Sequence, residues 1–172
     1  GKPMILSTGI AKENDIKLAL EACKRFGNDN IALLKCTSSY PAPIEDANLL
    51  TIQDMKSRFD VLVGLSDHTT NSKIPAYAVA LGACIVEKHF TLEKEDFGPD
   101  HSASVEPHEL KDLIIGIREV EAGLGSTRRV FCEKELGQRK VHRRSIVAKK
   151  IIKGGEELTM DNLTIKRPGT GI

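Results

Sequence analysis

The sequence contains no tryptophan, and aromatic residues make up only 4% of its 172 residues. A hydrophobic core must therefore be built from aliphatic side chains. The formal net charge is only +1, so nothing in the bulk electrostatics favours a nucleic-acid or membrane partner. The short basic run within residues 139–144 is interpreted as a solvated linker rather than a phosphate-binding surface.

Long apolar runs and closely spaced cysteines are also missing. No run approaches the roughly 18 residues of a membrane span, and no basic stretch leads into an apolar segment at the N-terminus, so we expect no signal peptide. The four cysteines are widely spaced, at Cys23, Cys36, Cys84 and Cys132. This spacing predicts reduced thiols in a cytoplasmic protein rather than a disulfide framework.

Short aliphatic runs alternate with helical patterns through the first part of the chain. The aliphatic runs cover residues 4–6, 31–34, 61–65 and 83–86. The helical patterns cover residues 15–26, 48–58, 74–81 and 107–124. Continuous aliphatic runs of this length are typical of strands that are buried on both faces. The alternation predicts an α/β fold with a parallel sheet.

The composition changes after residue 125. Residues 126–144 are charged and poor in aliphatic side chains, and we interpret them as a linker. Residues 145–148 and 163–165 have the pattern of strands, and Gly154-Gly155 marks a turn between them. The last part of the chain, residues 145–172, is therefore predicted to begin a small β-rich module.

Polar residues gather where the four predicted strands end, which is where parallel α/β folds bind ligands. His68 and His89 follow the third and fourth runs. Either histidine alone could be structural, but two imidazoles at equivalent strand ends indicate a site for a divalent metal. Asp67, which precedes His68, could orient a ligand or cap the next turn.

Three other segments carry candidate ligand-binding residues. Ser7, Thr8 and Gly9 precede a helix, a pattern that can hold phosphate through backbone N–H groups, although an ordinary strand-to-helix turn has the same pattern. Tyr40 lies in a proline-containing loop that could form a substrate wall or simply a rigid turn. Asp100 lies in a tight loop and could accept hydrogen bonds from sugar hydroxyls.

These segments occur in an order that resembles a known family. The motifs are LSTG at 6–9, KCTSSYPAP at 35–43, GLSDHT at 64–69, EKHFTL at 87–92, GPDH at 98–101 and KRPG at 166–169. Together they resemble the sialic acid synthase family, which makes N-acetylneuraminate, legionaminate or pseudaminate. The resemblance runs through essentially the whole chain, and the order and spacing of the motifs make it specific.

The resemblance implies a (β/α)8 TIM-type barrel followed by a small antifreeze-like (SAF) domain. Residues 1–125 would supply the second half of the barrel, residues 126–144 the linker, and residues 145–172 part of the antifreeze-like domain. It also implies a domain-swapped homodimer. The 172 residues would then be a fragment of a longer protein, and we expect the fragment alone to lack synthase activity.

The implied reaction joins phosphoenolpyruvate to an N-acylated mannosamine-like sugar and releases phosphate. His68 and His89 would bind the metal, with Mn²⁺ expected and Mg²⁺ or Co²⁺ as alternatives. The implied substrate-binding residues are Ser7 and Ser66 for the phosphate or carboxylate of phosphoenolpyruvate, Ser38, Tyr40 and Asp100 for the sugar, and Arg167 for the sugar's acyl group in the site of the partner subunit.

The sequence does not decide which sugar is the substrate, and it leaves two alternative functions open. Residues 35–49 resemble pseudaminate synthases, whereas residues 101–107 and 162–171 resemble the neuraminate and legionaminate branch. Another metal-dependent barrel enzyme, such as a different phosphoenolpyruvate-condensing synthase or an aldolase, would share the metal site. A non-catalytic fragment that binds sugar or mediates dimerisation would not need the two histidines.

Overall fold

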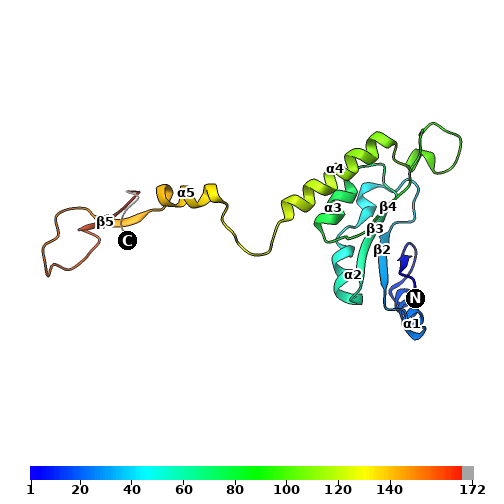
Figure 1. The fold of residues 1–172 in the computed structure, drawn as a ribbon, viewed down its shortest axis with the longest axis horizontal. Coiled ribbons are helices and arrows are strands. Elements are labelled where there is room, and N and C mark those ends of the chain that lie inside the picture. The colour runs from blue at the N-terminus through cyan, green and yellow to red at the C-terminus, as the bar shows by residue number, and fades with distance from the viewer. Residues whose placement is uncertain (168–172) are drawn as a thin grey trace. The chain divides into compact units, whose positions relative to one another are not determined.

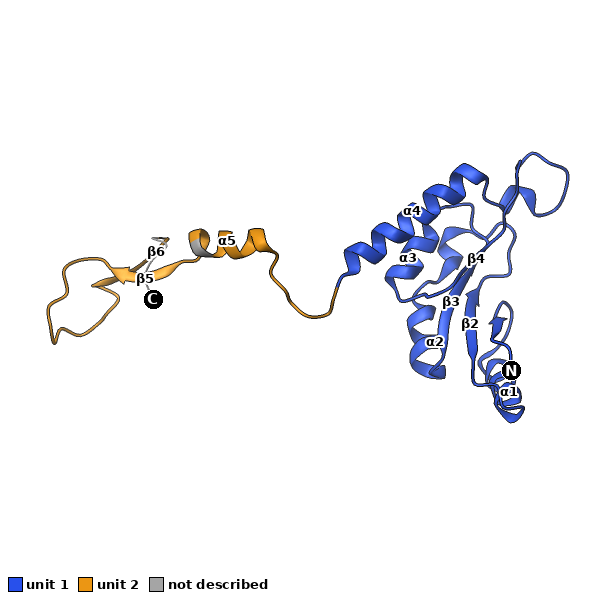
Figure 2. Cartoon of the chain, viewed as in Figure 1, with its two compact units in different colours: residues 1–125 blue, residues 126–172 orange. Residues whose placement is uncertain are grey.

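A computed structural model describes residues 1–167, which divide into two compact units, Gly1–Gly125 and a second that begins at Ser126 (Figure 2). The strands of the first unit are β1 (Met4–Ser7), β2 (Ile31–Cys36), β3 (Leu62–Asp67) and β4 (Val86–Lys88). Its helices are α1 (Glu13–Arg25), α2 (Thr51–Phe59), α3 (Ile74–Ala80) and α4 (Pro107–Leu124), with short 3-10 helices η1 (Ile44–Ala47) and η2 (His101–Ala103). The second unit contains α5 (Glu133–His142), β5 (Ser145–Ala148) and β6 (Leu163–Lys166).

Strands β1 to β4 form one parallel sheet in sequential order (Figure 1). The register places Leu33 of β2 beside Leu6 of β1 and Val63 of β3, and Leu65 of β3 beside Val86 of β4. A helix separates each strand from the next, so the unit has the arrangement of half of a parallel barrel. The predicted α/β fold with a parallel sheet is confirmed.

The core of the first unit lies where α2 and α3 pack against the sheet. Leu33 of β2 and Val63 of β3 are almost fully buried, and Ile52 of α2 and Ala78 of α3 have no exposed surface. The buried cluster consists of aliphatic side chains and one methionine. This composition agrees with the prediction that a chain poor in aromatic residues must build an aliphatic core.

Two elements of the first unit begin three residues later than predicted. The aliphatic run predicts a strand over residues 83–86, but β4 covers Val86–Lys88, because a strand's bounds follow its pairing partner rather than the hydrophobicity of the run. The helix predicted over residues 48–58 begins at Thr51. Asn48 has a left-handed φ of 42° and ends η1 before α2 begins.

In the second unit, β5 and β6 pair antiparallel, with Ile146 beside Ile165. The residues interpreted as a linker contain helix α5, whose first turn carries two glutamates that favour a helix N-terminus. Between β5 and β6, Gly155 adopts a left-handed φ of 84°, in keeping with the predicted turn. No helix within residues 1–167 has the length and apolar character needed to cross a membrane.

Gly64 lies at a close approach between β3 and the segment that leads into β4. A Cβ atom at this position would lie 2.4 Å from the Ile85 carbonyl oxygen and 2.6 Å from Leu34 Cδ2. Because a backbone oxygen cannot move aside without shifting the strand, we expect Gly64→Ala to lower the free energy of unfolding by about 1–3 kcal/mol, as overpacked cores do. Urea unfolding measures this change.

The matched control for Gly64 is Gly123 in α4. A Cβ atom there meets nothing within 4 Å, and alanine favours a helix more than glycine does. Gly123→Ala should therefore leave the stability unchanged or raise it slightly. Equal stability of the two variants would contradict the close packing at Gly64.

Candidate active site

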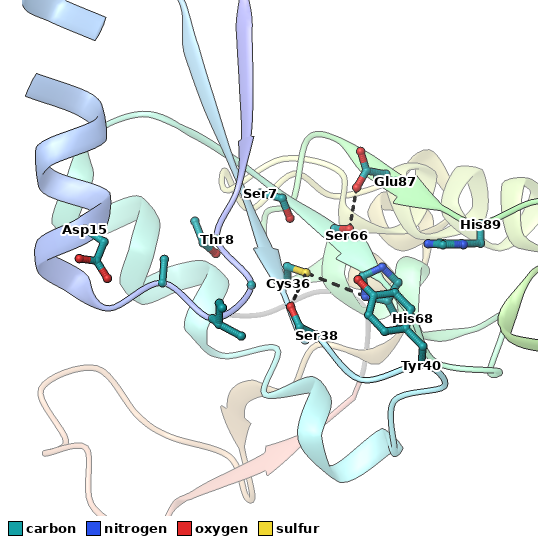
Figure 3. Close-up of a pocket in the computed structure, with 13 residues that line it drawn as sticks. Ser7, Thr8, Asp15, Cys36, Ser38, Tyr40, Ser66, His68, Glu87 and His89 are labelled. Atoms are coloured by element: carbon teal, nitrogen blue, oxygen red, sulfur yellow. Dashed lines mark hydrogen bonds between the residues drawn. The ribbon is translucent and has the colours of Figure 1, made fainter. Parts of the chain in front are cut away.

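The carboxyl ends of the four parallel strands border a cavity of about 620 Å³ (Figure 3). The predicted site residues that line it are Ser7, Ser38, Tyr40, Ser66, His68 and His89. Ser7 and Ser66 lie at the ends of β1 and β3, and the other four lie in the segments that follow β2, β3 and β4. The structure therefore brings together side chains that are up to 82 positions apart in the sequence (89 minus 7).

The alternation of strand residues explains why these side chains meet. The register pairs Ser66 with Glu87 and, one step further, Asp67 with Lys88. Residues two apart on a strand face the same side of a sheet. His68 therefore lies on the same side of the sheet as Ser66, and His89 on the same side as Glu87. This is the side that borders the cavity.

The two histidines face each other across the end of β3 and β4. Their ring centroids are 5.2 Å apart, and the ring planes meet at 72°. His68 is buried, and the side chain of His89 is 31% exposed. The ring of Tyr40 lies against His68, with a centroid distance of 4.2 Å, and 5.8 Å from His89. The aromatic group thus covers one side of the imidazole pair.

A backbone contact fixes the orientation of His68. Its Nδ1 atom lies 2.9 Å from the carbonyl oxygen of Thr37. Because a carbonyl oxygen can only accept, Nδ1 must carry the hydrogen, and Nε2 is the nitrogen that can bind a metal.

Thr37 is itself held in place by its side chain. Its hydroxyl donates to the Asp46 carbonyl oxygen at 2.9 Å and accepts a hydrogen bond from Lys35 Nζ. Burial lowers the pKa of the Lys35 ammonium. A partly buried network of polar groups therefore supports the carbonyl group that orients His68.

The donor set is suitable for a divalent transition-metal ion. Imidazole nitrogen is a good ligand for such ions, and a metal-binding histidine commonly donates its other ring N–H to a carbonyl group, as His68 does to Thr37. Within residues 1–167, no set of three or more histidine, cysteine or carboxylate side chains is arranged to hold a metal. An ion bound by His68 and His89 would therefore keep positions for other ligands.

Five residues that line the cavity were not predicted from the sequence: Glu87 and Cys36, and Ile10, Ala11 and Asp15 after β1. Glu87 accepts a hydrogen bond of 2.6 Å from Ser66 Oγ (Figure 3). Cys36 Sγ lies 3.9 Å from His68 Nδ1 and 4.0 Å from Ser38 Oγ. The alternation of side chains along a strand could have indicated Glu87 and Cys36. Glu87 lies two positions before His89, and Cys36 lies two positions before Ser38.

The turn after β1 approaches the cavity closely. A Cβ atom on Gly9 would lie 2.4 Å from Ser38 Oγ, so glycine allows the two segments to meet. The Thr8 N–H and hydroxyl groups both donate to the Leu34 carbonyl oxygen, at 3.0 and 2.8 Å. Thr8 thus serves the strand-to-helix turn, while Ser7 lines the cavity.

Asp100 does not line the cavity. The Asp100 side chain is 55% exposed, and its Oδ2 atom lies 3.8 Å from His89 Nδ1. Arg167 is exposed after β6 in the second unit. The remainder of its motif, Pro168 and Gly169, lies outside the described residues.

Comparisons with known proteins match nearly the whole chain. The model of the NeuB family matches residues 1–129. The N,N'-diacetyllegionaminic acid synthase of Campylobacter jejuni is 47% identical over 99% of this chain and 52% of that protein. The pseudaminic acid synthase of Helicobacter pylori is 40% identical over 99% of this chain and 50% of that protein.

Solved structures agree with these matches. The crystal structure of N-acetylneuraminic acid synthetase from Leptospira borgpetersenii is 36% identical, with a TM-score of 0.73 over 81% of this chain and 50% of that chain. The chain spans about half the length of the curated relatives it matches.

Proposed function

The chain belongs to the NeuB family, and from this premise we propose that it forms part of a synthase that condenses phosphoenolpyruvate with an N-acylated mannosamine-like sugar. The products are a nonulosonic acid and phosphate. The relatives named after legionaminic, pseudaminic and N-acetylneuraminic acid support this class of reaction.

The single observation that carries the proposal is the convergence of six predicted residues on one cavity. Two of them are paired imidazoles, and three are serines that can donate hydrogen bonds to anionic or hydroxyl groups. A cavity of about 620 Å³ is within the size range of small-molecule sites. A scaffold without catalysis gives no reason for these side chains to meet.

The proposed reaction forms one C–C bond, and at C2 of phosphoenolpyruvate a C–O bond from water replaces the C–O bond to phosphate. C3 of phosphoenolpyruvate attacks the aldehyde carbon of the open-chain sugar, water adds at C2, and the C–O bond to phosphate then breaks. His68 and His89 would hold a divalent ion, with Mn²⁺ proposed. When bound there, the ion supplies Lewis-acid stabilisation of the negative charge that develops on the aldehyde oxygen.

We propose that Ser7 and Ser66 bind the phosphate or carboxylate of phosphoenolpyruvate. A hydroxyl has only one hydrogen to donate, and in the structure Ser66 donates it to Glu87. When Ser66 donates to the substrate instead, Glu87 must lose this hydrogen bond. Glu87 is therefore placed to respond to substrate binding at Ser66.

Ser38, Tyr40 and Asp100 are proposed to lie near the sugar. Tyr40 and Asp100 both adjoin the imidazole pair, which supports their position beside the aldehyde end. Arg167 is proposed to reach the acyl group in the site of a partner subunit, and this role requires the domain-swapped homodimer.

The same proposal includes the finer architecture. Residues 1–125 would form the second half of a (β/α)8 barrel, and residues 145–172 part of an antifreeze-like domain. The β5–β6 pair supports a β-rich module there. We also propose that the protein works in the cytoplasm.

The proposed function is tested by phosphate release from the full-length protein with phosphoenolpyruvate and Mn²⁺. A panel of N-acylated mannosamines and related deoxy sugars would serve as acceptors. We expect Mn²⁺-dependent release with one member of the panel. A folded protein that binds Mn²⁺ but releases no phosphate with any sugar would contradict the synthase reaction.

Replacing Ser66 with alanine should raise the KM for phosphoenolpyruvate by about tenfold or more, because a hydrogen bond to a charged group contributes about 1.5–3 kcal/mol. Steady-state kinetics measures this value. Ser57→Ala, at an exposed position of α2, is the control and should leave the KM unchanged. An unaltered KM in Ser66→Ala would remove Ser66 from the proposed phosphoenolpyruvate site.

A further inference from the structure

We propose that a buried ion pair between Asp67 and Lys88 positions His68 and His89 for metal binding. The metal part of this inference rests on the proposed function, whereas the positioning of the two rings does not. Asp67 directly precedes His68, and Lys88 directly precedes His89. Neither residue of the pair lines the cavity, so both act through the histidines.

The pair joins the two strands at the last step of their register. Asp67 and Lys88 are partners in the β3–β4 ladder. Lys88 Nζ lies 2.8 Å from Asp67 Oδ2, and the side chains are 4% and 2% exposed, respectively. Because side chains alternate along a strand, this contact lies on the side of the sheet opposite the histidines.

Further hydrogen bonds tie the ion pair to Thr69, the residue that follows His68. Asp67 Oδ1 accepts the Thr69 N–H at 3.0 Å, and Oδ2 accepts the Thr69 hydroxyl at 3.2 Å. Lys88 Nζ also donates to the Thr69 carbonyl oxygen. The residue before His89 is thus joined to the residues on both sides of His68. Asp67 caps the turn, which is one of the two roles that the sequence left open for it, and it also makes an ion pair that the sequence did not predict.

The backbones of the two histidines are held in a corresponding way. The His68 carbonyl oxygen accepts the Ala42 N–H, and the His89 carbonyl oxygen accepts the Val105 N–H, each at 2.9 Å. These bonds extend each strand beyond its last ladder residue. The ion pair links Asp67, the residue before His68, to Lys88, the residue before His89.

The physical reason for an ion pair here is geometric specificity. A buried ion pair contributes little net stability compared with well-packed apolar residues. It does favour one register, because sliding β4 by one residue would leave Asp67 and Lys88 without their partners in a buried site. The same slip would turn His89 to the other face of the sheet.

The test is the double variant Asp67→Asn/Lys88→Met. The introduced asparagine keeps an oxygen that can accept the Thr69 N–H, and the introduced methionine keeps most of the length of the lysine stem, so the charges are removed together. In the metal-free full-length protein, we expect loss of the nuclear Overhauser effect between the two imidazole rings. We also expect the Kd for Mn²⁺ to rise at least about tenfold, the lower end of the effect of outer-shell changes at metal sites.

The matched control is Glu109→Gln/Lys94→Met, which neutralises a partly buried ion pair of the same unit away from the cavity. It should leave both measurements unchanged. An unchanged Overhauser effect and Kd in Asp67→Asn/Lys88→Met would overturn the proposal. If the unaltered protein does not bind Mn²⁺, the metal assignment fails, but the Overhauser comparison still decides whether the pair positions the rings.

Thr69→Val provides a second variant in case the double variant does not fold. It removes the hydroxyl that donates to Asp67 and keeps the shape of the side chain. The Overhauser effect should weaken and the Kd for Mn²⁺ should rise, both by less than in the double variant. No change in either measurement would overturn the proposal.

Discussion

Replacing His68 or His89 with alanine is expected to lower Mn²⁺-dependent phosphate release by about 10³-fold. A metal ion that polarises a reacting oxygen supplies several kcal/mol of stabilisation, about 4 kcal/mol, and each 1.4 kcal/mol is about a factor of ten in rate. The double variant His68→Ala/His89→Ala should be no slower than either single variant, because the two imidazoles act as one unit. Phosphate release measures the loss of rate, and Mn²⁺ titration measures the loss of metal binding.

His108 is the matched control, because it is a histidine of the same unit whose side chain is 73% exposed at the start of α4. His108→Ala should keep the rate and the Mn²⁺ affinity of the unaltered protein. A His68→Ala or His89→Ala variant that retains its rate within tenfold would remove the metal site from the proposed mechanism. A variant that loses Mn²⁺ but keeps its rate would favour a reaction without a metal.

The parallel sheet could be predicted because its central strands, β2 and β3, are largely buried. Burial on both faces requires continuous apolar runs such as Leu33-Leu34 and Val63-Gly64-Leu65, and such runs are visible without a structure. The strand β4 was misplaced because its last residues, Glu87 and Lys88, are charged. Their partners, Ser66 and Asp67, lie 21 positions earlier in the chain, and a pattern in a short window cannot show them.

The site could be predicted in part for the same reason. Side chains that follow buried strands gather at one edge of a parallel sheet, so Ser7, Ser66, His68 and His89 could be found from strand ends alone. The role of Thr37 could not, because it depends on its backbone carbonyl, which every residue type has. Nor could the sequence show that the Lys88 side chain is buried, since lysine side chains are mostly exposed.

The single substitution Lys88→Met is expected to lower the free energy of unfolding by about 3–5 kcal/mol, because it leaves the Asp67 carboxylate buried without its cation. The neighbouring Thr69 groups cannot replace that cation, since they offer only neutral hydrogen bonds to Asp67. The double variant Asp67→Asn/Lys88→Met should recover most of the loss, since a neutral amide is far less costly to bury than a charge. Urea unfolding of the unaltered protein, Lys88→Met, Asp67→Asn and the double variant gives the interaction energy between the two side chains.

Lys94→Met is the control for this stability effect. Lys94 pairs with Glu109, but the two side chains are 27% and 24% exposed, so solvent screens the charge that remains and the loss should be about 1 kcal/mol or less. The difference between Lys88→Met and Lys94→Met therefore isolates burial as the cause. Equal losses would mean that water reaches Asp67 when its partner is gone, and the β3–β4 register would then depend on backbone hydrogen bonds and on the Ser66–Glu87 contact instead.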